Sequence, residues 1–149
     1  MKLRRFEKED WKEIKTIYNL SKPDEMRGSV DLRALIPIEK DKKGIALFNE
    51  SQIFVVEENK TILGFGGHKG SYISWLFVHP AQRRRGVANM ILDHILNELT
   101  GTIKLNVGKH NKAAKSLYAK LGFKVEREFT GNFNGYKSEA LTMSLHKTS

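Results

Sequence analysis

The sequence predicts an α/β sandwich, in which helices flank a mixed, mostly antiparallel central sheet. Three observations support this class. Strand-like and helix-like segments alternate along the chain, neighbouring strand segments are joined by short turns, and one strand–helix–strand passage requires a right-handed crossover. The chain has 149 residues, 40% of them apolar, so we expect a single domain over residues 1–149.

The first part of the chain predicts a strand, a helix and a broken segment. Residues 2–7 are read as a short strand, and residues 9–20 as an amphipathic helix because apolar residues recur three to four positions apart. Residues 21–38 contain two prolines and a glycine that interrupt any regular pattern. We therefore expect a mobile segment there, with one short helix, lying over a binding site.

The middle of the chain predicts three antiparallel strands. Residues 52–58 and 61–68 form a hairpin around an Asn-Lys turn, and residues 72–78 follow after a Lys-Gly turn. The third strand is an almost entirely apolar run, which indicates that both of its faces are covered. Pro80 ends it.

The last part predicts two helices and three strands. Residues 86–101 carry apolar side chains at helical spacing and end at a glycine, and residues 102–107 form a strand. Residues 111–122 form the second helix of this part. Alternating patterns then predict strands at 123–129 and 139–146.

Composition narrows the class of function. The chain contains no cysteine, which excludes disulfides, thiolate metal sites and cysteine nucleophiles. A formal net charge of +9 points to an anionic partner without identifying it. No run of about 18 apolar residues and no secretory leader pattern is present, so we expect a cytoplasmic protein with no membrane partner.

Several common site motifs are absent. The five histidines show no metal-ligand spacing, so no metal is expected. The sequence also lacks a Walker A loop, a dinucleotide-binding G-x-G-x-x-G and a serine-hydrolase G-x-S-x-G. Nucleotide hydrolysis and serine hydrolysis are therefore disfavoured.

Basic residues directly precede the helix that begins near residue 86. Arg83, Arg84 and Arg85 are followed by Gly86 and, two positions later, by Ala88. The first turn of a helix offers unpaired N–H groups and the positive end of the helix dipole, and small residues let a phosphate reach them. A phosphate cradle is one interpretation of this segment, and a solvated basic turn is the other.

Two blocks of the sequence resemble the GNAT superfamily of N-acetyltransferases. WLFVHPAQRRRGVANMIL resembles the acyl-CoA signature [Q/R]-x-x-G-x-[G/A], with Ala88 where glycine is commoner. LNVGKHNKAAKSLYAKLGF resembles the second family block, N-x-x-A-x-x-x-Y-x-x-x-G-F. Together these blocks cover residues 72–123, and the order of the flanking elements agrees with the family.

The resemblance implies a GNAT-like fold with acetyl-CoA as cosubstrate. It places the pyrophosphate on the amides of residues 84–89 and the pantetheine arm between two splayed strands, 72–78 and 102–107. An N–H near residue 77 or 78 would then hold the thioester oxygen. The implied cofactor-binding residues are Phe77, Val78, Arg83, Arg84, Arg85, Gly86, Val87, Ala88, Asn89 and Asn111. Asn111 is also a natural helix N-cap.

The resemblance also implies a catalytic role for Tyr118, as the general acid that protonates the departing CoA thiolate. Without the motif, Tyr118 is better explained as a core aromatic of an amphipathic helix. The strand at 72–78 contains no acidic residue, so the glutamate base of many relatives cannot be carried over. His68 and a chain of water molecules are the two alternatives, and His79 is interpreted as a turn residue.

We therefore expect an acetyltransferase acting on a primary amine of a small molecule or peptide, as a monomer or homodimer and without nucleic acid. The acceptor is expected between residues 21–38, which carry Asp24, Glu25 and Asp31, and residues 130–137, which carry Phe133 and Tyr136. A non-catalytic CoA-binding sensor and, less favoured, a basic nucleic-acid-binding module remain as alternatives.

Overall fold

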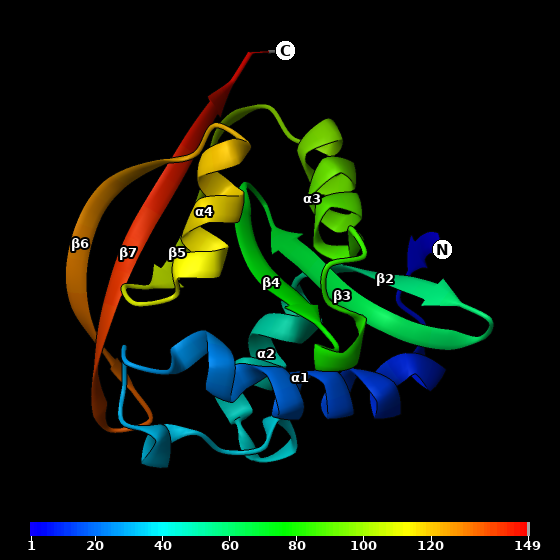
Figure 1. The fold of residues 1–149 in the computed structure, drawn as a ribbon, viewed down its shortest axis with the longest axis horizontal. Coiled ribbons are helices and arrows are strands. Elements are labelled where there is room, and N and C mark those ends of the chain that lie inside the picture. Colours follow the sequence, from blue (N-terminus) through cyan, green and yellow to red (C-terminus); the bar gives the residue numbers. More distant parts are fainter. Residues whose placement is uncertain (149) are drawn as a thin grey trace.

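The computed structural model describes residues 1–148, and within them seven strands form one sheet in the order β1-β2-β3-β4-β5-β7-β6 (Figure 1). All neighbouring strands are antiparallel except β4 and β5, which run parallel. The predicted mixed, mostly antiparallel sheet is thus confirmed. The strands are β1 (Lys2–Arg5), β2 (Gln52–Glu58), β3 (Thr61–Lys69), β4 (Tyr72–Val78), β5 (Gly101–Gly108), β6 (Lys124–Phe133) and β7 (Tyr136–Lys147).

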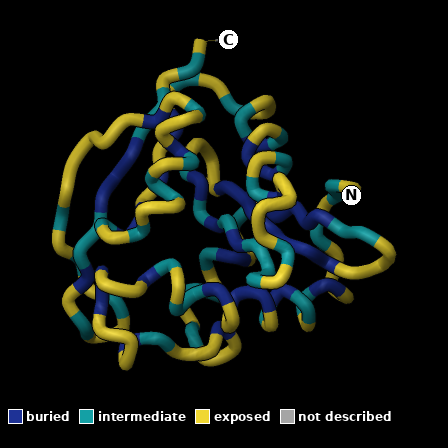
Figure 2. The backbone as a smooth tube through the Cα atoms, in the orientation of Figure 1, coloured by how far each residue is buried: buried dark blue, intermediate teal, exposed yellow. Residues whose placement is uncertain are grey.

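Helices pack on both faces of this sheet. On one face, α1 (Trp11–Met26) and α2 (Lys42–Glu50) bury an aromatic-rich cluster that includes Phe48, Phe65 and Trp75. On the other face, α3 (Val87–Glu98) and α4 (Lys112–Lys120) bury a largely aliphatic cluster against the central strands. Figure 2 shows the buried residues concentrated in these central strands. None of the described helices is both long and apolar enough to cross a membrane.

Helix α1 is longer than the sequence predicted. It continues through Pro23 to Met26, so the expected break at this proline is wrong. Tertiary contacts explain the extension, because Ser21 and Met26 are both buried and the Ser21 hydroxyl donates to the Val78 carbonyl at 3.0 Å. Packing of the last turn outweighs the hydrogen bond that proline cannot make.

Helix α2 was not predicted. Its N-cap is Asp41, whose carboxylate accepts the Gly44 amide hydrogen at 3.0 Å. Phe48 anchors the helix in the aromatic cluster. Between α1 and α2, Leu32–Ala34 and Ile38–Lys40 form short 3-10 helices, and Val30 pairs with Ser138 of β7.

Strands β6 and β7 form a longer hairpin than predicted, because both continue to a two-residue turn. Asn134 and Gly135 make this turn with φ angles of 51° and 87°, the conformation that matches the twist of a hairpin. Most of β6 is exposed (Figure 2). The segment expected to be a loop at residues 130–137 is therefore mostly strand.

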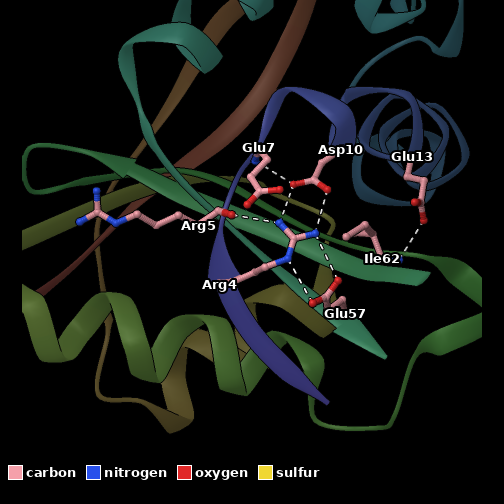
Figure 3. A network of polar contacts seen from close by, with 7 residues as sticks. All are labelled: Arg4, Arg5, Glu7, Asp10, Glu13, Glu57 and Ile62. Atoms are coloured by element: carbon pink, nitrogen blue, oxygen red, sulfur yellow. Dashed lines mark hydrogen bonds and ion pairs between the residues drawn. The ribbon is translucent and has the colours of Figure 1, made fainter. Parts of the chain in front are cut away.

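A partly buried ion-pair network fastens the N-terminus to the sheet (Figure 3). The Arg4 guanidinium donates to both carboxylate oxygens of Asp10, at 2.8 and 2.9 Å, and to Glu57 at 3.2 Å. Asp10 also accepts the Glu7 amide hydrogen at 2.8 Å and is only 5% exposed. The hydrogen bonds from Arg4 hold the pKa of Asp10 below its usual value.

The sheet is nearly interrupted between β4 and β5. The only register pair between these two strands, within residues 1–148, joins Tyr72 to Lys104, and the Lys104 amide donates to the Ser71 carbonyl at 3.0 Å. Beyond this pair the strands separate. The gap between them positions the candidate active site.

Candidate active site

A cleft of about 1000 Å³ runs through the gap between β4 and β5. Residues from both faces of the sheet line it, including Tyr18 of α1 on one face and Tyr118 of α4 on the other. The C-terminal half of α1, the start of α2 and the tip of the β6–β7 hairpin also line it. A ligand in this cleft can therefore reach from α4 through the sheet to α1.

The backbone of β4 presents one amide of particular interest to this gap. Successive residues of a strand direct their N–H and C=O groups to opposite sides. The His79 amide donates to the Leu63 carbonyl of β3 at 2.9 Å, and the Val78 carbonyl accepts from Ser21, away from β3. Of the two residues considered from the sequence, Val78 and not Phe77 thus turns its amide toward the gap. The Phe77 side chain packs in the aromatic cluster.

The start of α3 forms a small pocket next to this cleft. Gly86 is the N-cap at φ 81°, and the first helical hydrogen bond runs from the Met90 amide to the Gly86 carbonyl at 3.0 Å. The amides of the three intervening residues precede that bond, which makes the turn suited to an anion. The pocket measures about 180 Å³ and is lined by Val78, Gln82, Arg83, Arg84, Gly86, Val87, Ala88 and Asn89.

The three arginines occupy different environments. Arg83 donates to Asp24 of α1 at 2.9 Å, and Arg85 donates to Glu58 of β2 and to Gln82, both at 2.7 Å. Arg84 is exposed and holds a φ of 64°, unusual for a residue with a side chain. Two of the arginines therefore brace the turn through ion pairs, which neither interpretation of the sequence foresaw.

Tyr118 belongs both to the core and to the cleft. It is 7% exposed, its ring packs edge-on against Phe123 at 5.8 Å, and it lines the cleft wall. Burial, together with the nearby Glu25 carboxylate, raises the pKa of the Tyr118 phenol above its ordinary value. The phenol is thus protonated across the neutral range.

Asn111 caps α4, as its sequence position suggested. Its side-chain oxygen accepts the Ala114 amide hydrogen at 3.1 Å, and the residue also lines the cleft. The side-chain NH₂ group is not used by the cap. It is the part of Asn111 that a ligand in the cleft can contact.

The two histidines considered from the sequence lie away from the cleft lining. The His68 ring bonds to the Gly70 carbonyl at 2.9 Å, lies 3.6 Å from the Glu98 carboxylate and stacks on Phe54. His79 accepts the Ala81 amide hydrogen at 3.0 Å, which is the turn role expected of it. Among residues 1–148, no group of three or more metal-ligating side chains is placed to hold a metal ion.

The expected acceptor segments contribute unequally to the cleft. Asp24, Glu25 and Phe133 line it, whereas Asp31 pairs with Arg33 at 2.6 Å and Tyr136 packs near that same arginine. The sequence analysis missed Lys22 and Asp41, which also line the cleft. The available signal for Lys22 was its helical spacing from Tyr18 and Glu25, which the assumed break at Pro23 concealed.

A family model described as an acetyltransferase (GNAT) domain matches residues 49–125, about half of the chain. This match covers β2 to α4, including the pocket at Gly86, the β4–β5 gap and Tyr118.

Among characterised proteins, the human cysteine-rich protein 2-binding protein is 36% identical over 89 residues. The match covers 55% of this chain but only 11% of that protein's length.

Solved structures resemble nearly the whole chain. A GCN5-related N-acetyltransferase from Rhodopseudomonas palustris superposes with a TM-score of 0.83 at 19% identity, over 99% of this chain and 95% of that one. The putative acetyltransferase yncA from Salmonella typhimurium, solved with its cofactor acetyl-CoA, has a TM-score of 0.74 at 20% identity, over 100% and 95% of the two chains. These likenesses establish the fold.

Proposed function

Because this chain belongs to the GNAT acetyltransferase family, we propose that it moves the acetyl group of acetyl-CoA to a primary amine by direct attack. The observation that carries this proposal is the juxtaposition of two features. The anion-suited turn at Gly86 opens directly beside a cleft that passes between two separated parallel strands.

The first role in this proposal is to hold the cosubstrate. The pyrophosphate lies on the amides of residues 84–89, with Arg84 adding charge and with Arg83 and Arg85 keeping the turn in place. The pantetheine arm runs along the β4–β5 gap as a substitute strand. The Asn111 side chain donates to it. The fit is supported by the open space at Gly86, where even an added Cβ would meet nothing within 4 Å.

The second role is to stabilise the reaction. When the amine attacks, the thioester oxygen gains negative charge, and the Val78 amide is directed to receive it. The acetyl carbon–sulfur bond then breaks, and Tyr118 donates its phenolic proton to the CoA thiolate. This acid role is supported by the position of Tyr118 on the cleft wall.

A thiol-release assay with acetyl-CoA and a panel of amines tests this function, with detection of acetylated products by mass. Isothermal titration with acetyl-CoA is run in parallel. We expect saturable binding together with turnover of at least one amine. Failure to bind acetyl-CoA would overturn the proposal, and tight binding without turnover of any amine would instead favour the non-catalytic sensor.

A further inference from the structure

Three carboxylates line the cleft, and two of them have structural tasks. Asp24 is bound to Arg83 at 2.9 Å and lies 3.6 Å from Arg27. Asp41 caps α2 through the Gly44 amide. The third, Glu25, is bonded instead to another cleft residue, since the Lys22 ammonium donates to it at 3.2 Å. Glu25 is therefore the carboxylate that can change partner without dismantling the fold.

Lys22 is held in the cleft in an unusual way. Its nitrogen lies 5.5 Å from the ring centres of Tyr18 and Phe77 and 5.2 Å from that of Phe133. These rings come from α1, β4 and β6, so the ammonium sits where three elements meet. Burial alone would lower the pKa of Lys22, but the Glu25 charge and the other nearby groups outweigh it and raise the pKa. Lys22 thus stays a cation and is a poor nucleophile.

Charge balance limits which acceptor can enter. Five basic and three acidic side chains line the cleft, and the basic ones include Lys40, Lys42 and Lys43 at the start of α2. An acceptor bearing only an ammonium would draw Glu25 away from Lys22 and leave a buried cation unpaired, which is costly. An acceptor with its own anionic group supplies the missing partner and adds no net charge.

We propose that the acceptor is a free α-amino acid, whose ammonium group binds Glu25 and whose carboxylate binds Lys22. This rests on the proposed acetyltransferase function. An α-amino acid carries both charges on one carbon, so it can bridge two groups that are only 3.2 Å apart. The rings of Tyr18, Phe77 and Phe133 make the surrounding wall aromatic, which suits an apolar side chain.

The proton transfers follow from this placement. Glu25 takes one proton from the ammonium, which frees the nitrogen lone pair, and passes that proton to solvent. The nitrogen then bonds to the acetyl carbon as the carbon–sulfur bond breaks, and it releases its second proton to water. The thiolate takes the proton of Tyr118, which solvent restores. The products are the N-acetyl amino acid, CoA and one net proton.

The test compares three acceptors in the thiol-release assay: L-phenylalanine, L-phenylalanine amide and phenethylamine. We expect kcat/KM for phenylalanine to exceed that of the other two by at least about tenfold, the scale of a hydrogen bond between charged groups. The Lys22→Met variant is expected to lose this preference, mainly by raising KM for phenylalanine. The Glu25→Gln variant is expected to lower kcat for all three. Lys15→Met, on the same helix but outside the cleft lining, is the matched control.

The outcomes separate this inference from the function on which it rests. Equal use of phenethylamine and phenylalanine, or an unchanged preference in Lys22→Met, overturns the inference and leaves the acetyltransferase function intact. If no acceptor reacts, L-phenylalanine binding is titrated in the presence of CoA. Binding that is lost in both Lys22→Met and Glu25→Gln supports the inference, and absence of binding to the wild type overturns it. Thermal unfolding of each variant verifies that it is folded.

Discussion

The hydroxyl of Ser21 donates a hydrogen bond to the main-chain carbonyl of Val78, joining the middle of α1 to the end of β4. One turn further along α1, Asp24 makes an ion pair with Arg83 just beyond the same strand. These two contacts hold α1 against the turn that leads into α3. The Ser21 hydrogen bond also occupies the Val78 carbonyl, so that the amide of this residue is the group left for the cleft.

Replacing Gly86 with valine is expected to weaken acetyl-CoA binding by at least about tenfold, since the side chain covers the amides at the start of α3. A φ of 81° also disfavours any residue with a Cβ, at a cost of about 1–2 kcal/mol. Gly101→Val is the matched control, because Gly101 has a φ of 78° and an equally open surrounding but begins β5. Isothermal titration of both variants gives the comparison. Equal loss of acetyl-CoA affinity in both variants would contradict pyrophosphate binding at the start of α3.

Tyr118→Phe is expected to lower kcat by about 10²-fold or more, the usual worth of a positioned general acid, with little change in acetyl-CoA affinity. The ring and its packing against Phe123 are retained, so the free energy of unfolding stays close to that of the wild type. Tyr136→Phe, outside the cleft lining, serves as the control. A Tyr118→Phe enzyme with full kcat would remove the phenol from the mechanism.

Two substitutions at Asn111 separate its cap from its proposed contact with pantetheine. Asn111→Ala is expected to cost about 1 kcal/mol of stability and to weaken acetyl-CoA binding. Asn111→Asp keeps an oxygen for the Ala114 amide, so stability is largely restored while the NH₂ donor is lost. Urea unfolding and titration with acetyl-CoA are measured on both. Full affinity in the aspartate variant would mean that Asn111 acts only as a cap.

Asp10→Asn is expected to reduce the free energy of unfolding by about 2 kcal/mol at pH 7, because it weakens the charged hydrogen bonds that the buried Asp10 side chain accepts from Arg4. Since folding lowers the pKa of Asp10, its charge stabilises the folded wild type fully at pH values above the unfolded pKa of about 4. The stabilisation is lost as the pH falls through the lower folded value. Urea unfolding measured from pH 7 to pH 3 should thus show that the difference in free energy of unfolding between wild type and variant becomes smaller.

The exposed pair of Asp31 with Arg33 provides the control for this experiment. Asp31→Asn is expected to leave stability nearly unchanged at every pH, because solvent screens an ion pair at the surface. If the loss of unfolding free energy in Asp10→Asn did not change with pH, it would come from altered packing and not from the lost charge.

The features that sequence predicted well depend on neighbouring residues. The β2–β3 and β3–β4 turns, the glycine that begins α3 and the cap of α4 are set by backbone geometry and by side chains a few positions apart, so local sequence patterns predict them. The start of α3 depends on consecutive residues in the same way, whereas anion binding at its amides stays a prediction.

The features that sequence missed depend on distant contacts. Pro23 indicated a helix end, but burial of Ser21 and Met26 keeps α1 intact around it. The start of α2 was hidden because Gly44 weakens the helical pattern that Asp41 begins. The aromatic rings around the Lys22 ammonium include those of Phe77 and Phe133, which are far from it in the sequence. No local pattern predicts that these three elements meet.

Within residues 1–148, Tyr72 and Lys104 form the one register pair between β4 and β5, so these strands are unpaired with each other along most of their length. The main-chain groups on the facing edges of β4 and β5 are available to a ligand that carries amides of its own. A linear molecule with such groups would form hydrogen bonds to both strands and link the two halves of the sheet. Deuterium uptake by the amides of β4 and β5 should accordingly slow when acetyl-CoA is bound, even at residues distant from its phosphates.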